Sequence, residues 1–183
     1  MDYVTSWWNG TSANENEQEN KEEESSSSSN AGGVTETILL NATIEQAMQV
    51  ITDYEHYSEF LEGCNRTEVV SKSEDGKVQE VFWNVSVSFK TVEYVLRLTM
   101  DEDGKGISWT AVEDKAGPFV KNVGGWKLRE IDTPGVIEAT YSVDIELNVW
   151  VPEFLKNWVL SAGLPATLSS FKNRIESLAK EEQ

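Results

Sequence analysis

The sequence predicts an α+β domain in which a curved antiparallel sheet wraps around one long C-terminal helix. Three observations predict this class: a strand-like run at 34–40 leads into a short amphipathic helix, nearly ninety residues of strand-like alternation follow, and a long amphipathic helix ends the chain. A sheet that buries such a helix on its concave face often leaves a cavity between them, so a binding module is the leading hypothesis.

The first helix carries a start signal. Thr43 is followed three residues later by Gln46, the spacing of a capping box. The apolar residues behind this signal share one helical face: Ile44, Ala47, Met48 and Ile51. We expect a second short helical segment over 54–61, ending near Gly63.

The strands are predicted from apolar residues at every second position, which puts them on one sheet face. The clearest run spans 137–149, and turn signals lie at 73–76, 101–104 and 132–135. The apolar phase changes at Lys90-Thr91, so a bend or a tight connection is expected there. The last helix is expected to begin near Pro152 and to be kinked or broken at Gly163-Leu164-Pro165, because an interior proline removes a helical hydrogen bond.

Composition divides the chain into a tail, 1–33, and a domain, 34–183. The tail is rich in Glu, Asn and Ser, offers little apolar surface and is expected to be disordered. It holds seven acids and one lysine, so it carries −6 of the net charge of −17 and leaves −11 for the domain. A domain this acidic repels phosphate backbones, so we expect no nucleic-acid partner.

Location and partners are predicted from what the chain lacks. The lone cysteine, Cys64, has no internal disulfide partner, and no apolar signal segment follows the first methionine, so we expect a cytoplasmic protein without stable membrane insertion. The pair Trp7-Trp8 stands in an otherwise polar tail. It is either flexible sequence without a role or a docking motif for a protein partner.

Three segments carry a family resemblance. The segment 53–64, DYEHYSEFLEGC, resembles the aspartate followed by Tyr-Pro-x-Phe-Leu-Pro-x-Cys of the coenzyme-Q-binding and polyketide cyclase/dehydrase family, with Ser58 and Glu62 in place of its prolines. The segments 87–94 and 117–119 resemble two more family segments. Over about 34–178, the chain is therefore similar to the helix-grip (START-like, SRPBCC) superfamily, which implies a curved sheet around the C-terminal helix and an apolar ligand cavity.

The predicted ligand-binding residues are large side chains on the apolar faces and near the expected mouth. They are Phe60, Trp83, Tyr94, Trp109, Phe119, Trp126, Tyr141, Phe154 and Trp158. The Phe60 region, the Phe119 loop and the break at 163–165 are expected to gate entry. Spacing alone does not distinguish the wall of a cavity from a filled core, so both interpretations stay open.

The sequence points to no catalytic, metal or cofactor site. It contains no glycine-rich phosphate loop, no Gly-x-Ser-x-Gly elbow and no Cys or His pair at ligand spacing. His56 is the only histidine, and no cation neighbours Cys64 in sequence to lower its pKa. The hydroxyl groups of Tyr94 and Tyr141 either orient a ligand carbonyl or bond to the backbone of an ordinary core.

The predicted function is therefore binding or transport of an apolar small molecule, a quinone, isoprenoid or lipid, between the sheet and the last helix. Two alternatives come from other classes. A polyketide cyclase or aromatase would use Tyr94, Tyr141 or a strand polar group such as Asn84 to orient a keto chain. A protein-interaction module related to the ribosome-associating toxins would instead use its surface.

Removal of residues 1–32 tests the predicted domain boundary. The thermal midpoint of unfolding is expected to stay within a few degrees of the full chain, because the tail has too little apolar surface to dock. Differential scanning calorimetry measures it, with the double substitution Trp7→Ala, Trp8→Ala in the full chain as the control. A large drop in either variant would mean that the two indoles pack on the domain.

Overall fold

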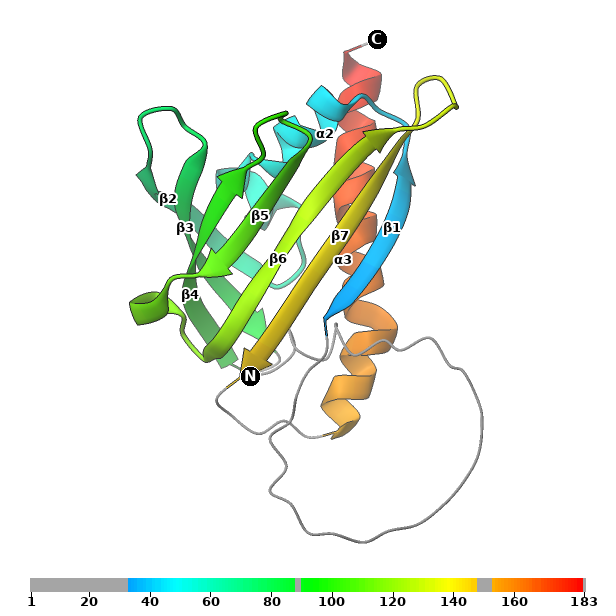
Figure 1. The fold of residues 1–183 in the computed structure, drawn as a ribbon. Coiled ribbons are helices and arrows are strands. Elements are labelled where there is room, and N and C mark those ends of the chain that lie inside the picture. The colour runs from blue at the N-terminus through cyan, green and yellow to red at the C-terminus, as the bar shows by residue number, and fades with distance from the viewer. Residues whose placement is uncertain (1–32, 88–89, 148–152, 183) are drawn as a thin grey trace, which may run out of the picture.

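The computed structural model describes residues 33–87, 90–147 and 153–182, and these form one antiparallel sheet with helices on one face (Figure 1). The seven strands lie in the order β1-β7-β6-β5-β4-β3-β2. The elements along the chain are β1 (Val34–Leu40), α2 (Ile44–Ile51), the 3-10 helix η1 (Tyr54–Glu59), β2 (Cys64–Lys72), β3 (Val78–Val87), β4 (Lys90–Met100), β5 (Gly106–Ala111), the 3-10 helix η2 (Glu113–Lys115), β6 (Phe119–Glu130), β7 (Ile137–Leu147) and α3 (Glu153–Glu181). The predicted α+β class is confirmed.

The connections explain how the sheet closes around the helix. Strands β2 to β7 follow one another as a meander, and β1 pairs with β7, so β1 and β2 form the two edges. Helices α2 and η1 carry the chain from one edge to the other; α2 contacts α3 and η1 contacts β2. The capping box predicted at the start of α2 is present: Gln46 N–H donates to the Thr43 hydroxyl at 3.2 Å, and Thr43 N–H donates to the Gln46 side chain at 2.9 Å.

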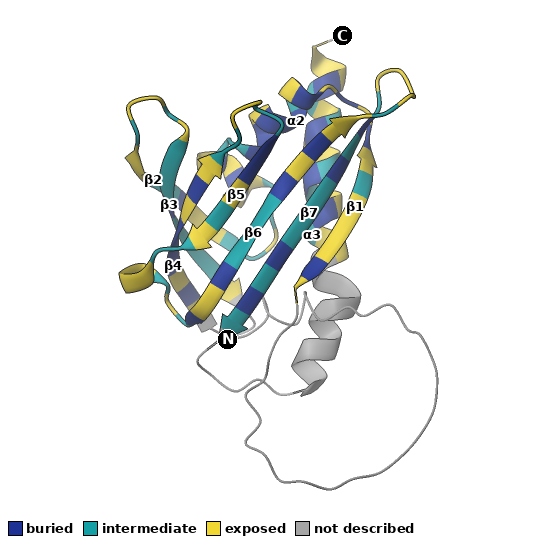
Figure 2. Ribbon diagram, viewed as in Figure 1, coloured by how far each residue is buried: buried dark blue, intermediate teal, exposed yellow. Residues whose placement is uncertain are grey.

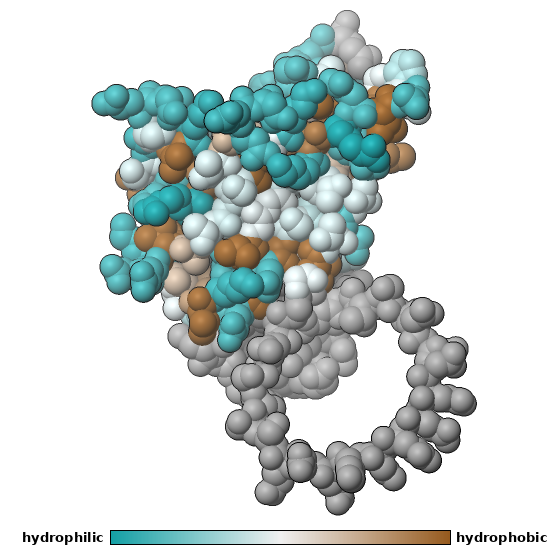
Figure 3. All heavy atoms as spheres, in the orientation of Figure 1, coloured by the Kyte–Doolittle hydropathy of each residue, from teal (hydrophilic) through white to brown (hydrophobic). Residues whose placement is uncertain are grey.

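Burial alternates along the strands, as the period of two predicts (Figure 2). On β7 the buried positions are Ile137, Ala139, Val143 and Ile145, with intermediate residues between them. The outer face of the sheet carries mainly hydrophilic and neutral side chains, with hydrophobic ones in small groups (Figure 3). The core therefore lies on the concave side, between sheet and helices.

Two exposed valines mark places where the sheet bends. Val70 and Val120 are 47% and 62% exposed, and each is the extra residue at a register shift, between Val69 and Ser71 on β2 and between Phe119 and Lys121 on β6. A β-bulge interrupts the alternation by one residue and bends the strand. The bulges therefore explain both the exposed side chains and part of the curvature.

Helix α3 is continuous from Glu153 to Glu181, with Pro165 inside it. The helix is therefore not broken at 163–165, whereas a kink there and a role of this segment in ligand entry stay predictions. Pro165 is exposed, so its side of the helix faces solvent, where water can satisfy the carbonyl that lacks a hydrogen-bond donor. Beyond the proline, one buried stripe faces the sheet: Leu168, Phe171, Ile175 and Ala179.

Polar contacts fix the second half of α3 to the edge of the sheet. The Glu176 carboxylate accepts hydrogen bonds from the backbone N–H of Asn41 at 3.0 Å and from its side-chain amide at 2.8 Å. Lys172 donates to the Leu39 carbonyl at 2.8 Å. Partial burial acts to raise the pKa of Glu176, but the bonds from Asn41 and the nearby Lys172 outweigh it, so this pKa lies below its usual value.

Glu176→Gln is expected to lower stability at neutral pH and to make stability less sensitive to acid. A carboxyl group whose pKa is lowered by folding stabilises the fold above its unfolded pKa, near 4.5, and this contribution disappears as pH falls through the folded pKa. Urea unfolding at pH 7 and pH 3 measures both effects. Glu181→Gln, on an exposed position of the same helix, is the control; equal acid sensitivity in the two variants would contradict the prediction.

Candidate ligand cavity

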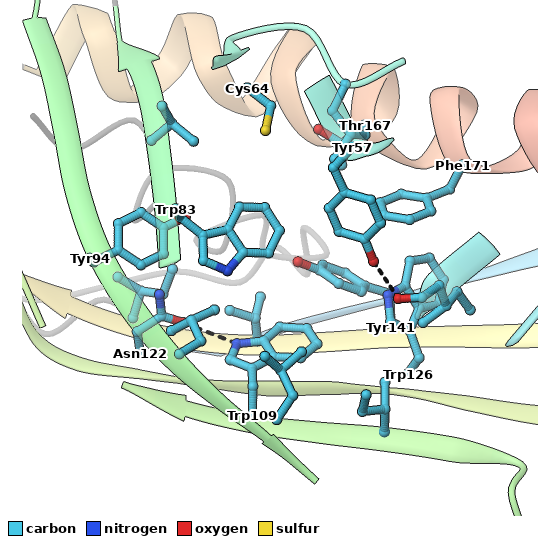
Figure 4. Close-up of a pocket in the computed structure, with 18 of the residues that line it drawn as sticks. Tyr57, Cys64, Trp83, Tyr94, Trp109, Asn122, Trp126, Tyr141, Thr167 and Phe171 are labelled. Atoms are coloured by element: carbon cyan, nitrogen blue, oxygen red, sulfur yellow. Dashed lines mark hydrogen bonds between the residues drawn. The ribbon is translucent and has the colours of Figure 1, made fainter. Parts of the chain in front are cut away.

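A cavity of about 150 Å³ lies between the concave face of the sheet and the helices (Figure 4). Its wall is built by residues from β2 to β7, from α2, η1 and the turn after η1, and from α3. Helix α3 contributes Thr167 and Phe171, and the turn contributes Leu61 and Glu62. The lining is mainly aromatic and aliphatic, as expected for a site that excludes water from an apolar ligand.

Five of the predicted ligand-binding residues line this cavity: Trp83, Tyr94, Trp109, Trp126 and Tyr141. Their role in binding stays a prediction. The side chains of Phe154 and Trp158 lie outside the described part of the structure.

Phe60 and Phe119 are not among the described lining residues, and their expected place at the mouth stays a prediction. Phe60 packs edge-on against Tyr57 and Phe171, with ring centroids 5.5 and 5.3 Å away. Phe119 is the first residue of β6 rather than part of a loop, and it is buried edge-on against Tyr94 at 4.9 Å. Each ring therefore packs against a residue of the wall.

The aromatic wall is held by contacts between its own rings. Trp83 and Tyr94 are stacked, with an interplanar angle of 4° and centroids 6.0 Å apart. Tyr141 lies between Trp109 and Trp126, at 5.4 and 4.7 Å. Such contacts restrict ring rotation, so the wall has a defined shape.

Gly124 makes room for the ring of Trp109. The two residues are cross-strand partners on β5 and β6, and a Cβ at position 124 would lie 2.4 Å from the Trp109 ring and 2.4 Å from the Ser142 carbonyl oxygen. The indole N–H of Trp109 donates to the side-chain oxygen of buried Asn122 at 3.1 Å (Figure 4). The missing side chain and the hydrogen bond together hold the indole against β6, which leaves space above it.

Gly124→Ala is expected to displace the Trp109 ring and to destabilise the fold by about 1–3 kcal/mol, the usual cost of overpacking. Urea unfolding gives the cost, and a shift of tryptophan emission reports the displaced ring. Thr110→Ala, on an exposed position of β5, is the control. Unchanged stability and emission would contradict the account of Gly124.

Two buried hydroxyl groups near the cavity bond to backbone carbonyls, whereas one indole N–H does not find an acceptor among the described residues. The Tyr57 hydroxyl donates to the Ile51 carbonyl, and the hydroxyl of buried Thr67 donates to the Tyr54 carbonyl, which ties η1 to α2 and β2. Among the described residues, the Trp83 ring nitrogen is the one buried side-chain nitrogen or oxygen without a hydrogen-bond partner. An unpaired buried donor costs about 1–3 kcal/mol.

The described tyrosines and the cysteine of the wall are neutral at physiological pH. Burial raises the pKa values of Tyr57, Tyr94 and Tyr141 and raises that of the Cys64 thiol to about 11. Glu62 is the one charged residue in the described lining. The described wall therefore holds neutral hydrogen-bonding groups and no acid–base pair of the kind that drives proton transfer.

His56 lies outside this wall. Its ring bonds to the Asp53 carboxylate at 2.6 Å on the surface, and this bond raises the pKa of His56. In the described ranges, no cluster of three or more His, Cys, Asp or Glu side chains is arranged to hold a metal. Nor does any described helix combine the length and the apolar composition that a membrane crossing requires.

The raised pKa of Cys64 predicts slow alkylation. The thiolate is the reactive form, so at pH 8 the folded protein is expected to react about a hundredfold more slowly than the unfolded chain, whose thiol pKa is near 9.0. Mass spectrometry after treatment with iodoacetamide measures the rate, which should rise with pH up to about 11. Equal alkylation rates in the folded and unfolded protein would contradict the raised pKa of Cys64.

Sequence reasoning left several wall residues out of the predicted site. Phe171 was visible only as one member of the apolar stripe on the last helix, and Tyr57 as one member of the segment 53–64. Asn122 lies four residues before Trp126, on the same face of β6, which is the available sequence signal for a polar group on this wall.

The fold and the cavity define a ligand-binding domain of the START and polyketide cyclase type. The chain belongs to the family described as polyketide cyclase/dehydrase and lipid transport, whose model matches residues 40–172. A ribosome association toxin, RatA, from Vibrio cholerae serotype O1 is 30% identical over 115 residues, which cover 63% of this chain and 72% of the toxin. The resemblance to the helix-grip superfamily is thus confirmed.

Solved structures show the same fold at low sequence identity. A START superfamily protein from Mycobacterium smegmatis superposes with a TM-score of 0.68 at 16% identity, over 80% of this chain and 98% of the other. The Zhui aromatase/cyclase from a Streptomyces species gives a TM-score of 0.65 at 15% identity, over 82% and 94%. At these identities the likeness establishes the fold and leaves the ligand open.

Proposed function

We propose that this protein binds an apolar small molecule, a quinone, isoprenoid or lipid, in the cavity between the sheet and α3, and acts as its carrier or chaperone. The observation that carries the proposal is the cavity of about 150 Å³ walled by aromatic and aliphatic side chains. Burial of apolar ligand surface against such a wall supplies the binding free energy, at about 0.8 kcal/mol for each buried methylene.

The volume of the cavity limits the size of the ligand that it can enclose. An engineered protein cavity of about 150 Å³ with an apolar lining binds benzene, so a cavity of this size suits one ring or one branched head group. A longer isoprenoid or acyl tail would need α3 to move or would lie outside. This size favours a ligand with a compact head over the long, fully enclosed keto chain that a cyclase would fold.

The charge of the wall favours a neutral ligand. Glu62 is the one charged group in the described lining, and no described lysine or arginine lines the cavity to balance a carboxylate. A fatty acid would therefore place its anion near another anion or leave it unpaired in an apolar site, which is costly. Neutral quinones and isoprenoid alcohols avoid this cost.

The Vibrio cholerae relative is named for its association with the ribosome. Such an association would use the outer surface of the protein and not the cavity. The net charge of −17 for the chain disfavours direct contact with RNA, because like charges repel at the phosphate backbone. A cytoplasmic location stays a prediction, and the partner suggested for the tail lies outside the described residues. The proposal therefore concerns the cavity alone.

A substitution that fills the cavity tests the proposal. Val85→Phe places a ring inside the lining, whereas Val70→Phe makes the same change at a bulge that is 47% exposed. Neutral quinones and isoprenoid alcohols are expected to raise the thermal midpoint of the wild type and of Val70→Phe in proportion to the logarithm of free ligand, and fatty acids are expected to raise it less. Val85→Phe should lose most of this response.

The measurement is a thermal unfolding series over ligand concentration. Native mass spectrometry of the same samples gives the stoichiometry, which should be one ligand per chain. If no member of the panel stabilises the wild type, or if Val85→Phe responds like Val70→Phe, the cavity is not the binding site and the proposal fails.

A further inference from the structure

The Trp83 indole stands out because its N–H group is buried and has no acceptor in the described part of the chain. Trp83 is on β3 and lines the cavity, and its ring is stacked on Tyr94 and tilted against Tyr57 at 5.4 Å (Figure 4). These contacts on two sides restrict the ring. The indole nitrogen is a donor only, so a water-excluded site leaves it unpaired unless an acceptor is brought in.

The indole of Trp109 is a second indole in the same wall, and its N–H group has an acceptor within the protein. Its indole N–H, on the same wall, is paired with the side-chain oxygen of Asn122 at 3.1 Å. Asn122 is 4% exposed, so its side-chain oxygen is a buried acceptor for this donor. No described side chain or backbone carbonyl serves Trp83 in the same way.

We propose that the Trp83 indole N–H donates a hydrogen bond to a neutral oxygen acceptor, a carbonyl or ether, on the head group of the bound apolar molecule. This inference rests on the proposed function and narrows it: the ligand carries an oxygen acceptor on a ring-sized head and is not a plain hydrocarbon. The acceptor is neutral because Glu62 is the one charged group in the described lining. A site that contains an unpaired buried donor discriminates against a ligand without the matching acceptor.

A pair of ring compounds of matched shape tests the hydrogen bond. Duroquinone and durene both carry four methyl groups on one six-membered ring, but only duroquinone has carbonyl oxygens. All ring positions of duroquinone are substituted, so it has no free position for addition of the Cys64 thiol, which lines the same cavity. The two compounds therefore differ mainly in the acceptor.

The first readout is the indole proton of Trp83 in the spectrum of protein labelled with nitrogen-15. The resonance is assigned among the seven tryptophans by its contacts with Tyr94 and by its loss in Trp83→Phe. Duroquinone is expected to move it downfield, as a new hydrogen bond does, whereas durene should not. This readout needs only the wild-type fold.

The second readout is the ratio of the two dissociation constants. The dissociation constant of durene divided by that of duroquinone is expected to be about fivefold larger in the wild type than in Trp83→Phe. This factor corresponds to one ordinary hydrogen bond. The ratio cancels the change of cavity shape that the substitution causes. Val70→Phe, at the exposed bulge on β2, is the control, because Val70 is not among the described lining residues, and the wild-type ratio should persist there.

The outcomes separate this inference from the proposal on which it rests. A downfield shift with duroquinone alone, and a ratio lost only in Trp83→Phe, supports the hydrogen bond. If both compounds bind equally well and the Trp83 resonance does not respond to the carbonyl, the hydrogen bond is refuted and the apolar cavity stands. If neither compound binds, this inference is overturned together with the proposed function.

Discussion

The packing of Phe171 against rings from η1, from the turn after η1 and from β6 is the contact on which the rest of the domain depends. Its ring centroid lies 5.3 Å from those of Tyr57, Phe60 and Trp126, so one residue of α3 meets η1, the turn behind it and β6. Phe171 is 4% exposed and also lines the cavity. The same contact therefore closes the sheet around the helix and defines one side of the binding space.

The cavity stays open because the aromatic rings of its wall pack against the sheet and against one another. They therefore do not fill the centre of the cavity. Gly124 and Asn122 keep the Trp109 indole close to β6, and the bulges at Val70 and Val120 add curvature to the strands. The wall so formed is neutral apart from one carboxylate. An apolar, mostly uncharged lining of this kind is suited to holding an uncharged molecule.

Much of the fold follows from local patterns of apolar and polar residues in the sequence. Alternation placed the strands and the side that each one buries, Thr43 and Gln46 marked the start of α2, and the stripe through Phe171 and Ile175 oriented α3. These patterns are reliable because the periods of strand and helix are set by backbone geometry and do not depend on distant contacts. They also placed the large aromatic residues on the concave face.

Only the tertiary structure decided which of those residues face a cavity and which support it. Phe60 and Phe119 are as aromatic as Trp83, but only Trp83 is among the described lining residues. Helix α3 runs on through Pro165 because that position faces solvent, and exposure is a property of packing. The unpaired N–H of Trp83 likewise depends on which acceptors distant strands bring near it, and residue spacing along one chain does not encode that set of neighbours.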